Sequence, residues 1–429
     1  MRFLKAGEKE FENYLEQMDQ REIQDSPQLE KQVGSILRNV RKRGDKALIH
    51  YTKVFDGIKI SASKLRVKPE EIKKAYQKVP RDFLKTLEKA AHRIRRFHQL
   101  MTQKSVSASE KKIQIGQEIR PLERVGIYVP GGKASYPSTV LMAAIPARVA
   151  GVEKIIMTTP PQEDGISPAV LVAADLAGVD QIYRVGGAQA VGALAYGTES
   201  IPKVDKIVGP GNRYVATAKR LVFGVVDVDM VAGPSEILII SDGKSSASSV
   251  AADLISQAEH DEMALPVLIT TSGAFARKVE DEIEKQIPSL KRGKIAKASL
   301  DGRGAILVVK ALQQAIEIAN RIAPEHLEIY LSHPVPLLKK IKNAGAVFLG
   351  LHTPEAIGDY LAGPNHILPT AGTARFSSPL GVEDFIKRMN WMYFTKEALK
   401  DFEKDVKRFA EWEGLEGHYR AVQIRLKQS

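Results

Sequence analysis

The feature that most limits the fold is an alternation of short apolar runs with alanine-rich amphipathic segments, which begins near Arg124. The runs have the length of buried strands, and the segments between them are long enough for crossover helices. The first series comprises residues 125–129, 154–158, 181–185 and 206–208, with helical segments at 139–150 and 168–177. A second series follows Gly233-Pro234, at 236–240, 266–270 and 305–309. The pattern predicts an α/β chain with two tandem Rossmann-like units, each built on a parallel sheet.

The two ends of the chain lack this alternation. Residues 26–43 and 70–101 carry apolar residues at intervals of three and four, which is typical of helices, and the chain after residue 381 is charged and loses the strand pattern. We therefore expect helical N- and C-terminal extensions, with segment boundaries at 1–110, 111–233, 234–380 and 381–429. The extensions either pack on a second subunit or cap their own chain. The similarity of the two α/β units is compatible with a distant duplication.

The amino-acid composition excludes some kinds of functional site and binding partner. The sequence has no cysteine, so disulfides, thiolate ligands and a thiol nucleophile are excluded, and any metal site must use nitrogen and oxygen ligands. No stretch approaches the roughly 20 apolar residues that cross a bilayer, and no apolar leader follows Met1, so we expect a cytoplasmic protein. The net charge of +12 raises the question of a nucleic-acid partner, but the basic residues are dispersed with few aromatics beside them, which favours a solvated basic surface.

Glycine-rich turns follow several strands of the first unit, at 130–132, 185–189 and 209–212. Turns at the carboxyl ends of parallel strands expose backbone amides that favour phosphate or dinucleotide binding. None of the turns matches the G-x-G-x-x-G pattern, and each could equally be a structural turn. Because Tyr128, Gln189 and Asn212 stand beside them, the three turns together favour a ligand.

Polar residues gather in four segments of the C-terminal half. Gln257 and His260 are three residues apart on a predicted helix and so share a face that could bind one ion, although a solvated helix end is the plainer alternative. Glu325 and His326 follow Pro324 on a predicted turn, where they could form a proton-transfer couple or simply lie on the surface. The other two segments are the loop 358–370, with Asp359, Asn365 and His366, and the stretch 413–418, with Glu413 and His418.

Taken together, these segments resemble the histidinol dehydrogenase family over essentially the whole chain. The motifs occur in the family's order and spacing: GIYVPGG at 126–132, VGGAQA at 185–190, VGPGN at 208–212, AGPSE at 232–236, SQAEH at 256–260, APEHL at 323–327, GPNH at 363–366 and EGLEGH at 413–418. Eight ordered matches are not expected by chance.

The resemblance implies a shared zinc site in a homodimer. It implies one zinc ion per subunit, bound by an all-nitrogen and oxygen set that suits this metal: Gln257, His260, Asp359 and His418. These ligands also contact the substrate, together with Ser235, His326, His366 and Glu413. His418 and Glu413 would cross from the partner subunit, and the first unit would bind NAD at Tyr128, Gln189 and Asn212.

The activity that the resemblance implies is the oxidation of L-histidinol to L-histidine through an aldehyde, with two NAD molecules in succession, at the end of histidine biosynthesis. His326 corresponds to the base that removes the hydroxyl proton, and Glu325 to the group that activates a water for addition to the aldehyde. A chain without cysteine cannot form a thiohemiacetal, so the aldehyde must be hydrated instead.

Two other functions remain open at this level. A zinc hydrolase would use Glu325 to activate a metal-bound water, and its glycine turns would be structural only. A basic nucleic-acid-binding protein is suggested by the net charge alone.

Overall fold

The computed structural model describes residues 1–21, 26–131, 135–231 and 233–428. The chain forms two compact units, each built from segments that are far apart in the sequence. The first unit contains Met1–Met101 and Leu122–Phe385, and the second contains Thr102–Pro121 and Ile386–Ser429.

Five parallel strands form the first sheet of the first unit, in the order β6-β5-β4-β7-β8. The strands are β4 (Arg124–Tyr128), β5 (Lys154–Thr159), β6 (Gln181–Arg184), β7 (Lys206–Val208) and β8 (Asp227–Val228). Both faces of the sheet are buried, which explains why its strands are almost continuously apolar.

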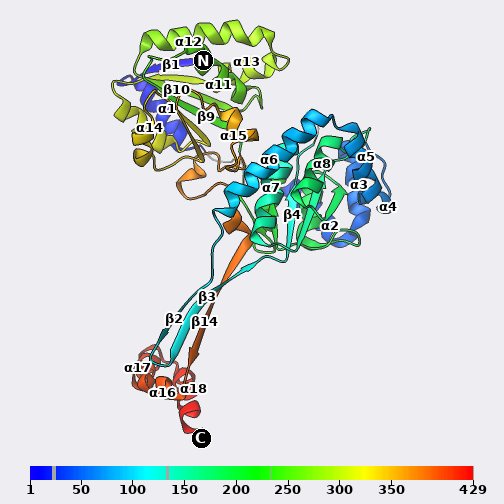
Figure 1. Cartoon of the computed structure of the whole chain (residues 1–429), viewed down its shortest axis with the longest axis vertical. Helices are drawn as coiled ribbons and strands as arrows, with labels where there is room; N and C mark the ends of the chain where they lie inside the picture. The colour runs from blue at the N-terminus through cyan, green and yellow to red at the C-terminus, as the bar shows by residue number, and fades with distance from the viewer. Residues whose placement is uncertain (22–25, 132–134, 232, 429) are drawn as a thin grey trace. The chain divides into compact units, whose positions relative to one another are not determined.

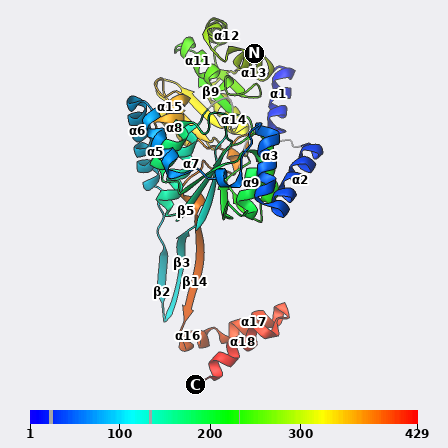
Figure 2. The same ribbon diagram turned by 90° about the vertical axis from the view of Figure 1, so that its right-hand side faces the viewer.

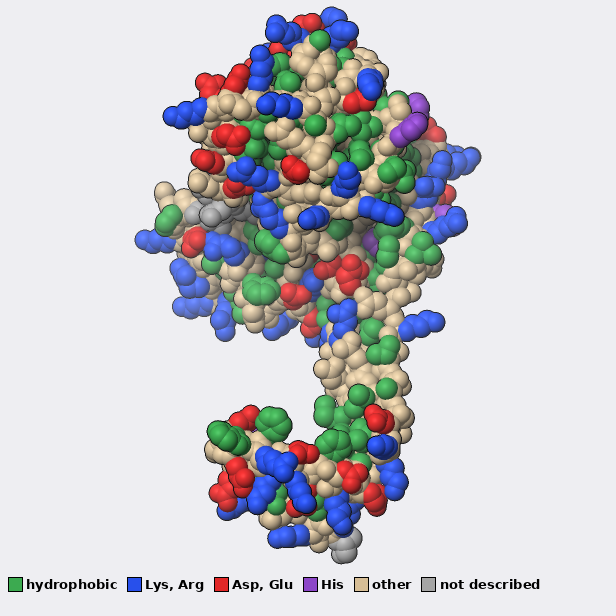
Figure 3. All heavy atoms as spheres, turned by 90° about the vertical axis from the view of Figure 1, so that its left-hand side faces the viewer, with side chains coloured by type: hydrophobic (Ala, Val, Ile, Leu, Met, Phe, Trp, Pro, Cys, Tyr) green, Lys and Arg blue, Asp and Glu red, His purple; other side chains and the backbone are tan. Residues whose placement is uncertain are grey.

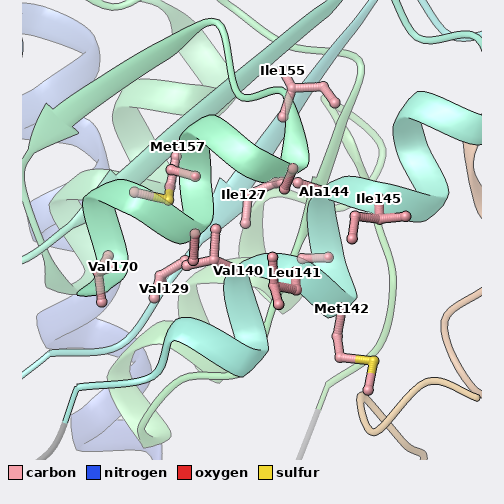
Figure 4. Packing of buried hydrophobic residues seen from close by; sticks show 14 of the residues in the cluster. Ile127, Val129, Val140, Leu141, Met142, Ala144, Ile145, Ile155, Met157 and Val170 are labelled. Carbon is pink, nitrogen blue, oxygen red and sulfur yellow. The ribbon is translucent and has the colours of Figure 1, made fainter. Parts of the chain in front are cut away.

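Helices cover each face of this sheet (Figures 1 and 2). One face packs on α5 (Pro69–Lys78), α6 (Arg81–Gln99), α7 (Pro137–Ala150) and α8 (Pro168–Ala177). The other packs on α2 (Pro27–Arg43), α3 (Asp45–Asp56), α4 (Ala62–Leu65), α9 (Gly187–Tyr196) and α10 (Arg213–Val222). Successive strand residues alternate between these layers: Ile155 and Met157 pack on the first face, as Figure 4 shows, and Ile156 on the second.

A second sheet in the same unit has six parallel strands in the order β1-β11-β10-β9-β12-β13. The strands are β1 (Arg2–Lys5), β9 (Glu236–Ser241), β10 (Leu265–Thr270), β11 (Ala305–Val308), β12 (His326–Tyr330) and β13 (Ala346–Leu349). One face packs on α1 (Lys9–Asp19) and α14 (Leu312–Ile322). The other packs on α11 (Ala247–Ala258), α12 (Gly273–Gln286) and α13 (Gly293–Gly302).

The second unit is a three-stranded antiparallel sheet with three helices. Its strand order is β14-β3-β2, and nine residue pairs join β14 (Ile386–Phe394) to β3 (Ile113–Pro121), which also pairs with β2 (Val106–Glu110). The helices are α16 (Lys396–Asp401), α17 (Glu403–Glu413) and α18 (Glu416–Lys427).

The predicted fold class, α/β with two parallel-sheet units, is confirmed. The structure groups the terminal segments differently from the four consecutive parts expected from the sequence. Residues 2–5 are a strand of the second sheet, and the helices of 27–99 cover the first sheet, so the N-terminal segment is part of the main unit. The sequence missed β1 because a four-residue strand at a sheet edge carries too short a pattern to recognise.

The strands of the second unit were also missed. Residues 386–394 were expected to be helical, and no strand was expected at 106–121. These segments nevertheless pair as strands of one sheet, although they lie far apart in the sequence. Both faces of this sheet are largely exposed, so neither β2 nor β14 shows the apolar alternation that marks a half-buried strand. Among the helices of the described residues, none combines the length and apolar character needed to cross a membrane.

Helix α1 is expected to be held by Phe11, which is 1% exposed and packs in the core beneath the second sheet. Phe11→Ala should lower the free energy of unfolding by about 3–5 kcal/mol, because it removes a buried ring and leaves a cavity. Urea denaturation followed by circular dichroism measures the change. The control is Phe223→Ala, whose side chain is 66% exposed; equal losses in the two variants would contradict the prediction.

Candidate active site

The end of α11 carries the first two predicted metal ligands. The helix runs from Ala247 to Ala258 and is capped by Ser246, whose Oγ accepts a hydrogen bond from the backbone nitrogen of Ser249 at 3.3 Å. Gln257 lies in its last turn and is fully buried. His260 lies just past the helix, where its backbone nitrogen donates to the carbonyl oxygen of Gln257 at 3.2 Å, and its side chain is exposed. The two residues therefore share one corner of the fold, although only Gln257 is on the helix itself.

A short helix, α15 (Glu355–Tyr360), brings two carboxylates to the same corner. Glu355 and Asp359 are four residues apart and so lie on one face of this helix. One ligand atom from each of His260, Glu355 and Asp359 lies within 4.8 Å of the others. The structure thus brings the predicted ligands Gln257, His260 and Asp359 together around a further acidic residue, Glu355.

Gly358 is required for this placement of α15. A Cβ at this position would lie 2.5 Å from Cε1 of Phe348, so any other residue would require the ring of Phe348 or the helix itself to shift. The ring of Phe348 in turn lies 5.9 Å from the imidazole of His326, centroid to centroid. Close packing at Gly358 therefore sets the distance between the acidic helix and the histidine.

His326 is the first residue of β12 and is almost completely buried. Its Nδ1 lies 2.9 Å from the backbone oxygen of Glu236 on the neighbouring strand β9. Because a carbonyl oxygen only accepts, Nδ1 carries the proton and Nε2 is left as a hydrogen-bond acceptor. Nε2 lies 3.9 Å from a carboxylate oxygen of Glu355 and 3.9 Å from one of Asp359. The imidazole is thus oriented so that Nε2 can take a proton at the acidic cluster.

Glu325 precedes β12, and its carboxylate accepts a hydrogen bond from the backbone nitrogen of Glu236 at 2.8 Å. The same carboxylate lies 3.6 Å from Nδ1 of His326. Burial raises the pKa of Glu325 from 4.5 to about 8. A carboxyl group with a pKa near neutrality can both accept and release a proton at the pH of a cell, which is the property of a general base.

The loop after α15 ties the acidic helix to the first sheet. Nδ1 of His366 donates to the backbone oxygen of Asp359 at 2.9 Å, and its Nε2 lies 3.5 Å from Oγ1 of Thr139 on α7. Asn365 is buried and donates to the backbone oxygen of Met142 at 2.7 Å. Burial lowers the pKa of His366, which favours the neutral form of its imidazole.

The remaining predicted substrate contacts lie in two places. Ser235 immediately precedes β9 in the first unit and is half-buried. Glu413, at the end of α17, and His418, near the start of α18, are exposed residues of the second unit. The first unit therefore supplies Gln257, His260 and Asp359 of the predicted zinc set, and His418 belongs to the other unit.

The predicted cofactor residues lie at the carboxyl ends of strands in the first sheet. The hydroxyl of Tyr128 accepts a hydrogen bond from the backbone nitrogen of Gly187 at 3.1 Å. Gln189 is 1% exposed, and neither atom of its amide has a hydrogen-bond partner in the part of the chain that the structure describes. Asn212 caps α10 by accepting from the backbone nitrogens of Tyr214 at 3.0 Å and Val215 at 3.2 Å.

One glycine of these turns is required by its surroundings. Gly209 has φ +111°, and a Cβ there would lie 2.1 Å from the backbone oxygen of Tyr128. Gly132 of the first turn is outside the described residues.

The family model described as histidinol dehydrogenase matches residues 19–426. The chain belongs to the histidinol dehydrogenase family. A curated histidinol dehydrogenase of Geobacter sulfurreducens is 52% identical over 429 residues, which covers 100% of both chains. One of Syntrophotalea carbinolica is 54% identical over 402 residues, covering 94% of this chain and 93% of the relative. The crystal structure of histidinol dehydrogenase from Elizabethkingia anophelis has a TM-score of 0.93 at 37% identity and covers 100% of this chain and 98% of that one.

The chain is therefore an oxidoreductase of histidine biosynthesis with histidinol dehydrogenase function. Sequence reasoning missed Glu355, although a usable signal was present. Glu355 and Asp359 have the spacing of residues on one helix face, but the glycine- and proline-rich stretch from Gly358 was interpreted as an extended loop.

The raised pKa of Glu325 predicts how stability changes with pH. The folded protein holds a proton, with a pKa of about 8, that the unfolded chain releases near the ordinary value of 4.5. Stability should therefore fall as pH rises between these values, by at most about 1.4 kcal/mol per pH unit. Glu325→Gln keeps an oxygen for the Glu236 N–H and removes the titration.

Urea denaturation of metal-free protein at about pH 5 and about pH 8 tests this dependence. The variant should gain stability relative to the wild type as pH rises. Glu317→Gln, which removes an exposed carboxylate from α14, is the control and should parallel the wild type. Parallel pH profiles for Glu325→Gln and the wild type would show that the buried carboxyl does not hold this proton.

Proposed function

We propose that this protein is a zinc-dependent L-histidinol dehydrogenase that carries out two successive NAD-linked oxidations, from L-histidinol through L-histidinal to L-histidine. The observation that carries the proposal is the geometry at His326. An imidazole that is fixed through Nδ1 by a backbone carbonyl presents Nε2 to a cluster of nitrogen and oxygen ligands. Membership of an oxidoreductase family supports this function over a zinc hydrolase.

The residues at the end of α11 and on α15 fit a divalent cation. His260 and Asp359 supply ligand atoms that lie together, and Gln257 adds a buried amide beside them. Burial and the neighbouring charge of Asp359 raise the pKa of Glu355, so the crowded carboxylates at this corner would be stabilised by a cation beside them. Gln257, His260 and Asp359 would hold the ion, with His418 as the fourth ligand; zinc would supply a template that orients the substrate.

The glycine turns of the first sheet fit a dinucleotide. Gln189 is the observation that favours a ligand there, because an amide buried without partners among the described residues is costly unless something else satisfies it. Tyr128 and Asn212 lie at the carboxyl ends of neighbouring strands, where dinucleotides bind in α/β sheets. We infer that these three residues bind NAD, which would accept a hydride in each oxidation.

Proton transfers in both oxidations are assigned to the strand β12 and the residue before it. Nε2 of His326 would accept the proton of the substrate hydroxyl as hydride departs. Glu325 would take a proton from the water that adds to the aldehyde, and a pKa of about 8 suits a group that must later release that proton. His366 would act beside them by fixing the backbone of Asp359, and Ser235 and Glu413 would contact the substrate.

Exposed apolar residues on the second unit favour a homodimer. A groove of about 580 Å³ runs over its sheet and is lined by residues that include Val106, Ile115 and Met392, which are 65%, 52% and 70% exposed. Trp412, next to Glu413, is 93% exposed. Figure 3 shows hydrophobic side chains on the surface of this unit. A second copy that covers them would let His418 and Glu413 of the partner subunit complete each site.

Turnover of L-histidinol tests the proposed function directly. Zinc-loaded protein with L-histidinol and NAD should produce NADH, seen as a rise in absorbance, with two NADH formed for each L-histidine. A flat trace under zinc-replete conditions would refute the proposal. Tight, salt-dependent retardation of DNA or RNA would instead revive a nucleic-acid function.

Variants of the two proposed bases should separate the two oxidations. His326→Asn should slow both about 10²- to 10⁴-fold, because each needs a proton acceptor. Glu325→Gln should mainly slow the second, because only that oxidation consumes water. Stopped-flow measurements with L-histidinol and with L-histidinal give the two rates; equal losses from Glu325→Gln in both half-reactions would contradict the assignment.

His418→Ala should lower the zinc content without unfolding the protein, since its side chain is exposed in the second unit. Metal analysis and thermal unfolding measure the two effects. Mixing unfolded His418→Ala and His326→Asn chains and refolding them together should restore about a quarter of the wild-type activity, because half of the dimers then hold one intact site. No recovery in the mixture would show that His418 acts within its own chain.

A further inference from the structure

The amide of Gln257 and the carboxylate of Glu355 form a buried pair, and the proposed reaction gives Glu355 no role. Gln257 is 0% exposed and Glu355 is 2% exposed. In the amide orientation that satisfies both of its ends, the nitrogen of Gln257 faces the carboxylate of Glu355 and donates at 2.7 Å to Oε1 and at 2.9 Å to Oε2. Hydrogen bonds to a carboxylate are about twice as strong as those between neutral groups. The hydrogen bonds of this pair therefore fix the position of the amide nitrogen and, with it, that of the amide oxygen.

Glu355 is itself held from two sides. Oγ of Ser256, the residue before Gln257, donates to its Oε2 at 3.2 Å. The backbone nitrogen of Glu355 donates to Oε1 of Glu328, on β12, at 2.7 Å. The carboxylate of Glu355 is thus bound by α11, and its backbone is bound to the strand that carries His326, which limits how far the residue can move with the amide.

The orientation of the amide matters because its two ends differ in what they can bind. The oxygen of a glutamine side chain is a metal ligand, whereas its NH₂ group carries only donor hydrogens and repels a cation. The two ends are nearly equal in size, so packing alone does not choose between them. A partner that only accepts hydrogen bonds favours the orientation in which the amide nitrogen faces it.

We propose that Glu355 is a positioning residue: it binds the amide nitrogen of Gln257 through both carboxylate oxygens and so turns Oε1 of Gln257 toward the zinc ion. The proposal rests on the zinc dependence in the proposed function. It assigns to Glu355 a part that differs from direct ligation, which its closeness to His260 and Asp359 would also allow. Partners of metal ligands of this kind change metal affinity about 10- to 100-fold when they are replaced.

Zinc binding by the full-length protein tests the proposal. The protein is stripped with a chelator and titrated with zinc against a competing chelating dye, and bound zinc is also measured by metal analysis. Glu355→Gln should bind zinc about 10- to 100-fold more weakly, because one acceptor for the amide is replaced by a donor. Glu355→Asp keeps the charge but draws the carboxylate back, and an intermediate loss is expected.

The control is Glu259→Gln, which removes a negative charge between Gln257 and His260 without touching the amide. It should bind zinc nearly as the wild type does. If Glu259→Gln weakened zinc binding as much as Glu355→Gln, the effect would be one of general charge, and the positioning role would be wrong.

A double variant separates positioning from direct ligation. If Glu355 acts through Gln257, then Gln257→Ala with Glu355→Gln should bind zinc no more weakly than Gln257→Ala alone. A further loss in the double variant would make Glu355 an independent ligand and would overturn the proposal. If the wild type binds zinc and Glu355→Gln binds it equally well, this inference alone is overturned. If the wild type binds no zinc, the proposed zinc dependence is overturned as well.

Discussion

One residue of β9, Glu236, orients both side chains to which proton transfer is assigned. Its backbone nitrogen donates to Glu325, and its backbone oxygen accepts from Nδ1 of His326. The parallel register brings this about, because His326 lies opposite Ile237 and so beside the backbone of Glu236. Backbone groups inside a sheet have no rotamers to choose from, so they fix the carboxyl group and the imidazole tautomer more firmly than side chains would.

The side chain of Glu236 is itself held in place by several hydrogen bonds, which stabilise the position of its backbone. Arg21 donates to its two oxygens at 3.0 and 3.2 Å, and the backbone nitrogen of Ala371 donates at 3.2 Å. Both side chains of the ion pair are less than a tenth exposed. A buried ion pair repays its desolvation only when further hydrogen bonds satisfy it, and Arg21 makes two more, to backbone oxygens of Met18 and Ile322. A residue of the N-terminal segment thus binds the residue of β9 that orients Glu325 and His326.

The sequence predicted the parts of this protein whose patterns are local. The central strands of both parallel sheets were recognisable because burial on both faces makes them continuously apolar, as in residues 155–157 and 237–240, whereas the short strands β1, β8 and β13 were not. The residues of the site were found through motifs, and the structure brings Gln257, His260 and Asp359 together. Hydrogen bonds between side chains or backbone groups about 90 or more residues apart, such as Arg21 to Glu236 and Glu236 to Glu325, leave no periodic trace. A strand such as β14 also leaves no periodic pattern in the sequence, because its partner lies elsewhere in the chain and both of its faces are exposed.

The pairing of β14 with β3 has a consequence for biosynthesis. Ile113 pairs with Phe394, and Pro121 with Ile386, so β3 leaves the ribosome long before its main partner exists. Until then β3 offers unpaired backbone groups along one edge, with only the short hairpin to β2 in place. The nascent chain must carry this open edge while both parallel sheets assemble, and the antiparallel sheet closes only after residues 386–394 have been translated.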